Sequence, residues 1–501
     1  MRHSGVWALA LVGLALAFRL TLAIGFPNDE PDDGKVYALL AHNLVTAGVY
    51  SAEDTPPLTP TYVRVPGYPA FIAIVYRAFG DNNNTAVRVV QACLDTVTCG
   101  LLAAMTMVWA PRSWSPQRRR RAALVALALA AACPFVAIYV TTILTETLAT
   151  ALGVLVLLLA SLAVRRAGGA AEFDGVLPSW IPRSRTLWAA AGLAGGGMTL
   201  VRPESGLYVA AIGVLLLVTS WRWAGRVGLG IREWWRRVLV CGFALSLGFA
   251  VALAPWTIRN AVVFHTFQPL NPRSLSMPGE FVAWGYADWL RSWIDHPRYV
   301  GPVLFALDRE PISIDQIPAR AFDSPDERDQ VARLLRQYST PAPDAEADET
   351  GHVPPSGITP ELDAAFGAIA SARATRHPLR QYVVLPFKRA VMLWFDPHAD
   401  YYPFAGFLYP WAALDADRDQ QFWLPLFTGL TWLWTIAGWI GAIVLWRYRE
   451  GRKWLLLVAL TILPRLALLS WMENPEPRYT MEFFPVVTAL GGCALSFKRR
   501  V

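Results

Sequence analysis

A dense group of carboxylates follows the first long apolar run of the chain, in the stretch that begins N-D-E-P-D-D-G-K-V-Y. The group comprises Asp29, Glu30, Asp32, Asp33, Glu53 and Asp54, and only Lys35 and Arg64 oppose it between residues 26 and 64. A positioned carboxylate can act as a general base, and hard divalent cations prefer several carboxylate oxygens. The residues alone leave three interpretations open: a general base, a divalent metal site with Asp29 and Glu30 as ligands, or a solvated charge run.

Further ionisable residues lie where apolar segments end, several of them in turns that contain proline. They are Arg64 in V-R-V-P-G-Y-P, Glu146 in L-T-E-T-L, Arg202 and Glu204 in T-L-V-R-P-E, Arg259 in A-P-W-T-I-R-N and Arg478 in N-P-E-P-R-Y. An ionisable residue near bilayer depth costs about 2.5–3.5 kcal/mol on insertion scales. The planar fork of arginine suits phosphate, which favours a shared cavity for an anionic head group. The alternatives are snorkelling of each arginine to lipid head groups and, for Glu146, a place at a helix N-terminus.

The elements that must position these residues are membrane-spanning helices. The chain of 501 residues is 54% hydrophobic and only 17% charged, whereas soluble domains carry about 25% charged residues. A bilayer core needs about 20 apolar residues per helix. The spans expected on that basis number ten: 5–25, 87–110, 122–141, 145–163, 187–201, 204–220, 238–258, 422–446, 454–472 and 479–497. The fifth is short for a crossing, and 67–79 could form an additional helix that dips into the membrane.

The basic residues of the loops predict how the chain is oriented. Arginines concentrate in 111–121, 164–186, 221–237 and 447–453, which alternate with loops that lack such clusters. The positive-inside rule then predicts cytoplasmic N- and C-termini in the plasma or inner membrane, and places the acidic stretch and the proline-flanked arginines on the extracytoplasmic face. The net charge of +7 is therefore a sign of topology and not of nucleic-acid binding.

Three regions follow from this topology. Residues 1–264 form an N-terminal membrane module with a catalytic first outer loop at 26–86, 265–421 form an extracytoplasmic segment, and 422–501 form C-terminal membrane helices. Within the second region, 325–338 and 361–376 are expected to be helical and 340–360 disordered. Residues 378–396 carry Lys388 and Arg389 in an apolar run, which predicts an interfacial helix and not a span. The expected fold class is an all-α polytopic membrane protein with a mostly helical or irregular outer segment.

Five motifs, in this order along the chain, resemble a known family. The first motif is D-x-x-x-Y-A-x-x-A-x-N-L-x-x-x-G-x-Y followed by R-x-P-G-Y-P. The other four are T-E-T-L-A-T, G-G-G-M-T-L-V-R-P-E, A-P-W-T-I-R-N and E-P-R-Y-T-M-E-F-F-P. Together they resemble the motifs of polyprenyl-phosphate-dependent glycosyltransferases of the GT-C type. The nearest branch includes bacterial relatives of protein O-mannosyltransferases and the lipid A aminoarabinose transferase. The resemblance covers 5–260 well, the last three spans moderately and 265–420 poorly.

The resemblance implies an inverting transfer of a sugar from a lipid phosphate to an acceptor, with an acidic residue of the first outer loop as base. Asp33, four residues before Tyr37, stands at the family's usual place. Arg64 matches a basic residue that faces the lipid phosphate in relatives, and Arg202 and Arg478 fall in similar motifs. Tyr37, Glu146 and Arg259 are the remaining candidates for substrate binding. The run D-G-K-V-Y departs from the aminoarabinose branch, because Val36 stands where an arginine is expected and Lys35 precedes it.

The sequence thus predicts a membrane glycosyltransferase that uses a polyprenyl-phosphate-linked sugar. It leaves open whether a divalent metal ion serves as cofactor. The alternative is a flippase for a lipid-linked sugar, which would use the same cavity without forming a bond. Transporters often contain inverted repeats and helices broken at the midplane, and this chain shows no such symmetry. The sugar stays open, and a protein, a lipid or a glycan could each be the acceptor.

Overall fold

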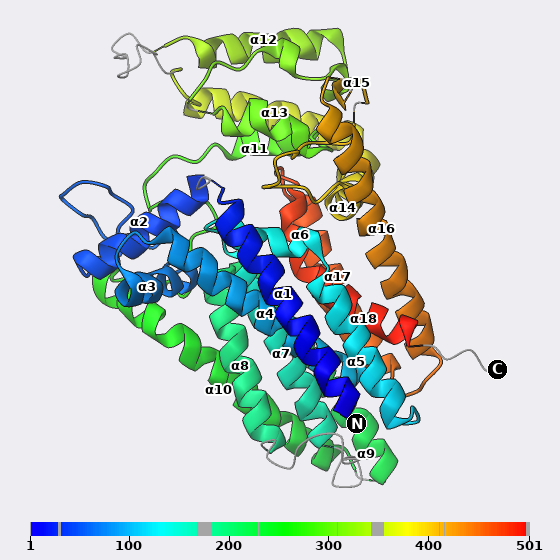
Figure 1. Ribbon diagram of the computed structural model, residues 1–501. Coiled ribbons are helices and arrows are strands. Elements are labelled where there is room, and N and C mark those ends of the chain that lie inside the picture. The colour runs from blue at the N-terminus through cyan, green and yellow to red at the C-terminus, as the bar shows by residue number, and fades with distance from the viewer. Residues whose placement is uncertain are drawn as a thin grey trace.

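The computed structural model describes residues 2–28, 32–167, 183–228, 230–307, 309–341, 355–409, 411–414 and 416–496, and these residues form helices and loops with no strand (Figure 1). In chain order the α-helices are α1 (Arg2–Gly25), α2 (Asp32–Thr46), α3 (Gly67–Phe79), α4 (Asn84–Trp109), α5 (Pro116–Ala131), α6 (Pro134–Ala137), α7 (Glu146–Arg166), α8 (Ser184–Val201), α9 (Gly206–Val227), α10 (Ile231–Phe264), α11 (Trp284–Arg291), α12 (Pro325–Ser339), α13 (Pro360–Arg376), α14 (Leu385–Phe395), α15 (Trp411–Leu414), α16 (Arg418–Trp446), α17 (Arg452–Trp471) and α18 (Phe484–Leu495).

The long helices confirm an all-α polytopic membrane protein. Over the described ranges, seven helices are long and apolar enough to cross a membrane, namely α1, α4, α7, α9, α10, α16 and α17. An eighth span results if the segments 116–131 and 134–141, which meet at a bend of 56°, are counted together. Pro134 explains this break, because its ring removes a backbone donor and clashes with the preceding turn.

The other two predicted spans are helices of lesser length. The 18 residues of α8 occupy 184–201, as the expected short fifth span requires. The last predicted span is divided between a 3₁₀ segment at Pro477–Phe483 and the 12 residues of α18. Twelve residues rise only about 18 Å, which is less than the bilayer core of about 30 Å. The extra helix considered at 67–79 is present as α3.

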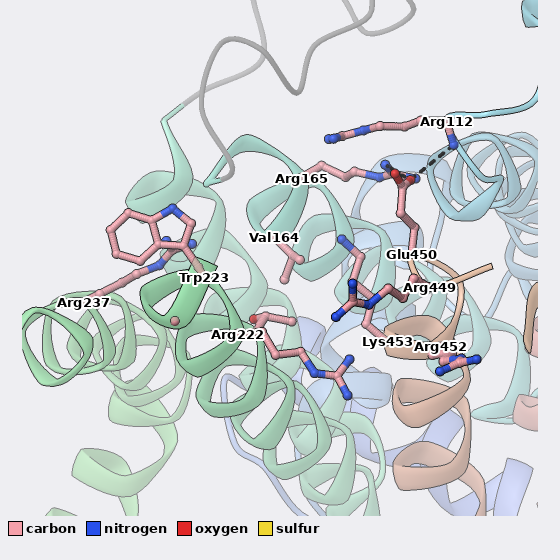
Figure 2. A pocket seen from close by; sticks show the side chains of 12 residues that line it. Arg112, Val164, Arg165, Arg222, Trp223, Arg237, Arg449, Glu450, Arg452 and Lys453 are labelled. Carbon is pink, nitrogen blue, oxygen red and sulfur yellow. Dashed lines mark hydrogen bonds and ion pairs between the residues drawn. The ribbon is translucent and has the colours of Figure 1, made fainter. Parts of the chain in front are cut away.

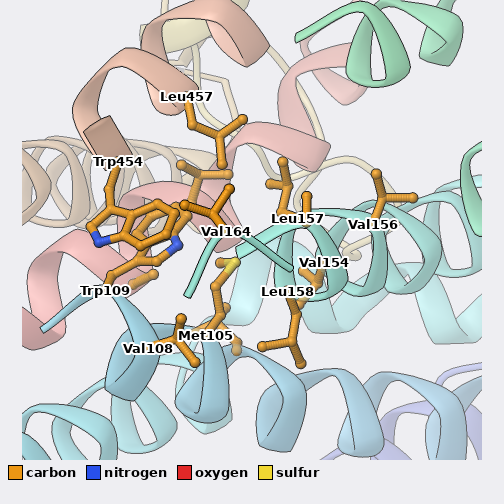
Figure 3. Packing of buried hydrophobic residues seen from close by; sticks show 14 of the residues in the cluster. Met105, Val108, Trp109, Val154, Val156, Leu157, Leu158, Val164, Trp454 and Leu457 are labelled. Atoms are coloured by element: carbon orange, nitrogen blue, oxygen red, sulfur yellow. The ribbon is translucent and has the colours of Figure 1, made fainter. Parts of the chain in front are cut away.

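The bundle is held by close packing of aromatic and small residues. Trp109 of α4 stacks on Trp454 of α17 (Figure 3), with ring centres 6.2 Å apart. The Trp109 indole N–H donates to Ser161 on α7 over 2.9 Å. Helices α8 and α10 approach so closely that a Cβ added at Gly192 would lie 2.0 Å from the carbonyl oxygen of Leu245. Small residues at a helix crossing are the usual means of such close approach in membranes.

One buried ion pair links the first three spans. The Arg19 guanidinium of α1 lies 2.5 Å from a carboxylate oxygen of Asp95 on α4, and Arg19 is only 1% exposed. The same guanidinium donates to the carbonyl oxygens of Ala130 and Ala131 over 3.0 and 3.1 Å. These carbonyls lie at the C-terminus of α5, where the helix breaks and leaves acceptors without helical partners. Arg19 therefore satisfies the broken end of α5 as well as Asp95.

A small helical subdomain covers one end of the bundle, above α2 and α3 (Figure 1). Helices α11, α12 and α13 share a core around Trp289, Trp293, Val331 and Phe366. The structure confirms the helices expected near 325–338 and 361–376. Of the expected disordered run 340–360, residues 342–354 lie outside the part of the chain that the structure describes.

Arg389 explains why the apolar run at 378–396 contains a charge. The run forms a π-helical turn at Arg380–Val384 and then α14, whose 11 residues are too short to span a membrane. Arg389 is 1% exposed and donates to the carbonyl oxygen of Ile294 over 2.7 Å. It thus ties α14 to the end of the subdomain.

Candidate active site

The acidic stretch folds into α2 and a loop that returns to α3. Helix α2 begins with Asp32 and Asp33, where carboxylates are favoured by the helix dipole. Near its end, the Asn43 amide donates to the carbonyl oxygens of Ser51 and Glu53 over 2.9 and 2.8 Å. At the start of the loop, the Tyr50 hydroxyl lies 3.2 Å from the carbonyl oxygen of Arg64. These contacts hold Arg64 above the first turn of α2.

Gly67 fixes the distance between this loop and the end of α8. A Cβ built at Gly67 would lie 2.5 Å from the carbonyl oxygen of Leu200 and 2.8 Å from the backbone nitrogen of Val201. Only glycine permits this approach, because the atoms that it meets belong to the backbone. The R-x-P-G-Y-P motif is therefore packed directly against the residue pair that precedes Arg202.

A cavity of about 440 Å³ opens between α2, the end of α8, α11 and the end of α17. Six of the seven residues expected to form the catalytic or substrate-binding site line it: Asp33, Tyr37, Arg64, Glu146, Arg202 and Arg478. The chain brings them together from five separate segments. The positive-inside pattern of the loops predicts that these segments lie on one face of the membrane.

Asp33 lies between two arginines. One carboxylate oxygen of Asp33 accepts a hydrogen bond of 2.8 Å from Arg64, and the other lies 3.4 Å from Arg478. Arg478 also pairs with Glu476. The side chain of Asp33 is 33% exposed, so a ligand in the cavity can reach it.

Tyr37 covers one side of this ion pair. The guanidinium carbon of Arg64 lies 5.9 Å from the centre of the Tyr37 ring, and Tyr37 packs edge-on against Tyr68. Burial raises the pKa of Tyr37 to about 12, with a smaller opposing effect from Arg64. Tyr37 therefore stays neutral at physiological pH and can donate a hydrogen bond.

A buried ion network forms the floor of the cavity. Arg202 lies 3.1 Å from Glu146, 2.9 Å from Glu204 and 3.4 Å from Glu482. Arg465 of α17, which is fully buried, lies 3.2 Å from Glu204 and 2.7 Å from Glu482. Three carboxylates thus surround two guanidinium groups, so the charge of Arg202 is already compensated.

Apolar side chains form the rim. Trp284, Leu275, Leu468 and Met472 line the cavity and are 41%, 43%, 44% and 38% exposed. Large apolar groups left open beside a charged cavity are suited to a ligand with a polar head and an apolar tail. Arg291 of α11 also lines the cavity and pairs with Glu473 over 3.0 Å.

Arg259 does not line this cavity. Its guanidinium donates to the carbonyl oxygen of Thr61 over 2.8 Å and lies 5.0 Å from the centre of the Trp256 ring. It therefore holds the loop between α2 and α3 against α10.

Asp29 and Glu30, the expected metal ligands, lie outside the described residues. Within the described ranges, no group of three or more His, Cys, Asp or Glu residues is placed to hold a metal ion. Asp32 does not line the cavity, and its carboxylate lies 2.9 Å from Arg309. The described residues alone therefore provide no ligand set for a divalent ion.

Arg465 and Glu482 were not predicted as members of the site. Both fall inside segments that read as apolar spans, Arg465 in L-P-R-L and Glu482 in M-E-F-F. The available signal was the charge itself, since an ionisable residue within a span is expensive unless it has a partner. Arg273 and Arg291 were also missed, because only the fold brings 265–291 to the cavity. Glu473 was missed although it lies five residues before Arg478.

The solved structures that match this chain have low sequence identity to it, although the alignments cover nearly all of this chain. No family model and no curated protein matches the chain. Among solved structures, the oligosaccharyltransferase of Archaeoglobus fulgidus tethered to an acceptor peptide aligns with 97% of this chain and 49% of its own, at 16% identity and a TM-score of 0.47. ArnT from Cupriavidus metallidurans bound to undecaprenyl phosphate aligns with 98% of this chain and 78% of its own, at 14% identity and a TM-score of 0.37. This chain spans about half the length of the oligosaccharyltransferase.

Proposed function

We propose that this protein is an inverting glycosyltransferase that moves a sugar from a polyprenyl-phosphate donor to an acceptor. The observation that carries the proposal is Asp33 held between Arg64 and Arg478, at 2.8 and 3.4 Å, in a cavity with an apolar rim. A base and paired phosphate ligands in one cavity match the needs of this reaction. The sequence motifs around all three residues resemble those of the GT-C type.

The ion pairs of Asp33 suggest how donor binding prepares the base. A phosphate attracts guanidinium groups at least as strongly as a carboxylate does, through paired hydrogen bonds. When the lipid phosphate enters, Arg64 and Arg478 turn toward it and release the Asp33 oxygens. Asp33 can then accept a hydrogen bond from the acceptor nucleophile.

The reaction uses these groups in one step. The acceptor oxygen or nitrogen attacks the anomeric carbon while its proton passes to Asp33. The bond between the anomeric carbon and the phosphate oxygen breaks, and the negative charge that develops on the phosphate is stabilised by Arg64 and Arg478. Attack from the side opposite the leaving group inverts the anomeric centre.

Arg202 and Glu146 have a supporting role in this scheme. Because Arg202 is already surrounded by three carboxylates, it has less attraction for a phosphate than Arg64 has. The network fixes the ends of α7, α8 and α17 relative to one another. It therefore sets the shape of the cavity floor under the sugar.

The small helical subdomain supplies the side of the cavity at which the acceptor binds. Trp284 and Arg291 reach the cavity from α11, which belongs to the subdomain at the end of the bundle. An acceptor that enters between this subdomain and α2 would approach Asp33 directly. The basic loops at the opposite end of the bundle favour an extracytoplasmic location for the cavity and cytoplasmic termini.

A transfer assay separates this proposal from the flippase alternative. Purified full-length protein in detergent is given radiolabelled polyprenyl-phosphate sugars and extracted lipid, glycan and protein acceptors. A glycosylated product supports the enzyme, because there is no second compartment to receive a transported lipid. Transport of the lipid-linked sugar in vesicles without any product in detergent would support the flippase. Repetition after treatment with a chelator tests the divalent metal ion.

A further inference from the structure

A second cavity lies at the end of the bundle opposite Asp33. It encloses about 740 Å³ between the ends of α7 and α9, the start of α10 and the turn that joins α16 to α17 (Figure 2). This volume is within the range of small-ligand sites, which is about 300–1,000 Å³. The function proposed above makes no use of this cavity.

Its lining is strongly basic. Among the residues that the structure describes, seven arginines or lysines line the cavity, and Glu450 is the one acidic residue of that lining. Charges of one sign within about 8 Å of one another are poorly screened at physiological ionic strength. Their concentration around one hollow therefore favours a bound anion.

Glu450 is already engaged. Its carboxylate lies 3.4 Å from the Arg165 guanidinium and accepts a hydrogen bond of 3.2 Å from the backbone N–H of Arg112. Arg165 is 3% exposed and also donates to the carbonyl oxygens of Val108 and Ala110 over 2.6 and 3.0 Å. Arg165 and Glu450 thus form a fixed wall, which joins the end of α4 to the turn after α16.

The remaining basic groups approach the hollow from other elements. Arg237 of α10 stacks over Trp223, with its guanidinium carbon 4.4 Å from the ring centre. Arg222 lies on α9, and Arg449 lies in the turn across the cavity. Both are exposed, so their side chains can reach a ligand. Basic loops are expected at this end of any membrane protein, but that expectation does not explain why their side chains surround a common cavity.

We propose that this cavity binds an anion that carries two phosphate groups. Seven basic groups against one carboxylate exceed the charge of a single phosphate, and the arginine fork binds phosphate oxygens in pairs. Exposed tryptophans lie at the adjoining helix ends, with Trp221 58% and Trp446 60% exposed, as at a membrane interface. Basic pockets between membrane helices are suited to lipids such as cardiolipin. The same chemistry would bind a free pyrophosphate.

Two binding experiments test the proposal with the full-length protein. In the first, inorganic pyrophosphate is titrated against the detergent-purified protein, and binding is followed by calorimetry at two salt concentrations. In the second, nanodiscs with and without cardiolipin in phosphatidylcholine are compared by native mass spectrometry for retained lipid. Pyrophosphate binding without retained cardiolipin identifies a soluble ligand, and retained cardiolipin identifies a lipid head group. The absence of both pyrophosphate binding and retained cardiolipin would overturn the proposal.

A matched pair of variants shows whether the cavity is the binding site. The test variant R222Q/R449Q removes two charges that face the cavity. The control R120Q/R121Q removes two exposed charges from the start of α5, which do not line it. Loss of one charge-assisted contact weakens binding by about tenfold or more, so R222Q/R449Q should bind at least tenfold more weakly than the control. Equal weakening in both variants would mean general attraction to a basic surface, and would overturn the proposal. The comparison requires that both variants have the melting temperature and the gel-filtration elution volume of the wild type.

Discussion

The carboxylate of Asp33 accepts a hydrogen bond of 2.8 Å from Arg64, 31 residues later in the chain, across the mouth of the cavity. The loop between them is fixed by Asn43 and Tyr50 at one side and by the contact of Gly67 with α8 at the other. The proposed base and its phosphate ligand are thus parts of one rigid unit.

Replacement of Arg64 by Gln should reduce transfer strongly. Removal of one donor that stabilises developing charge costs about 10²–10³-fold in rate, and R64K should recover part of the activity because it keeps the charge without the fork. The measurement is the initial rate over a range of donor concentrations. R309Q is the control, since Arg309 pairs with the exposed Asp32 and does not line the cavity. Equal values of kcat/KM for R64Q and the control would contradict the assigned role.

Replacement of Gly67 by Ala should damage the site through the backbone. The new Cβ would lie 2.5 Å from the carbonyl oxygen of Leu200, and overpacking of this kind costs about 1–3 kcal/mol. We expect a lower melting temperature and reduced transfer. G100A in α4 is the matched control, because a Cβ at Gly100 meets nothing within 4 Å. A melting temperature for G67A at or above that of G100A would show that α3 and α8 can separate freely.

Replacement of Arg465 by Leu should destabilise the fold. Arg465 is fully buried and pairs with Glu204 and Glu482, and removal of one partner from a buried ion pair costs about 3–5 kcal/mol. The double variant R465L/E482L should regain part of this loss, because it leaves fewer carboxylates without a partner. Thermal unfolding in detergent measures both. A single variant as stable as the wild type would exclude a structural role for this network.

Asp400 should make stability depend on pH. Burial, and then the neighbouring Glu476, raise the pKa of the Asp400 carboxyl to about 6, above the usual value of about 4. The folded state therefore binds this proton more tightly than the unfolded state. The stability that it contributes is complete below pH of about 4 and is lost as the pH rises through about 6.

The variant D400N should remove this dependence. Its melting temperature should exceed that of the wild type at pH 8 and equal it near pH 4. D54N, which alters an exposed carboxyl, should follow the wild type throughout. Parallel curves for D400N and the wild type would show that Asp400 does not titrate in this range.

The sequence predicted the helices and six of the residues that line the cavity, because both depend on local signals. Apolar length revealed the spans, and the motifs around Asp33, Arg64, Arg202 and Arg478 identified residues that the structure brings together. Arg259 shared the same kind of motif yet packs against Thr61 and Trp256. A proline-flanked arginine at a helix end thus predicts on which face of the bundle the residue lies, but not whether it lines the cavity with Asp33.

The residues that sequence reasoning missed depend on contacts between distant segments. Arg19 with Asp95, and Arg465 with Glu482, were counted as parts of spans, although each charge signalled a buried partner. The position of α11 over the cavity depends on a core of aromatic residues shared by α11 and α13, including Tyr286, Trp289 and Phe366. No local pattern in 265–421 reveals this packing.

The most direct test of the proposed function is sugar transfer by D33N in the detergent assay with radiolabelled donor. Asp33 lines the cavity, whereas Asp32 is exposed and pairs with Arg309, so D32N is the matched control. We expect D33N to fold, to bind the polyprenyl phosphate and to transfer sugar at least 10²-fold more slowly, about the contribution of a general base. D32N should transfer at nearly the wild-type rate. Transfer by D33N at the wild-type rate would contradict the assignment of Asp33 as the base.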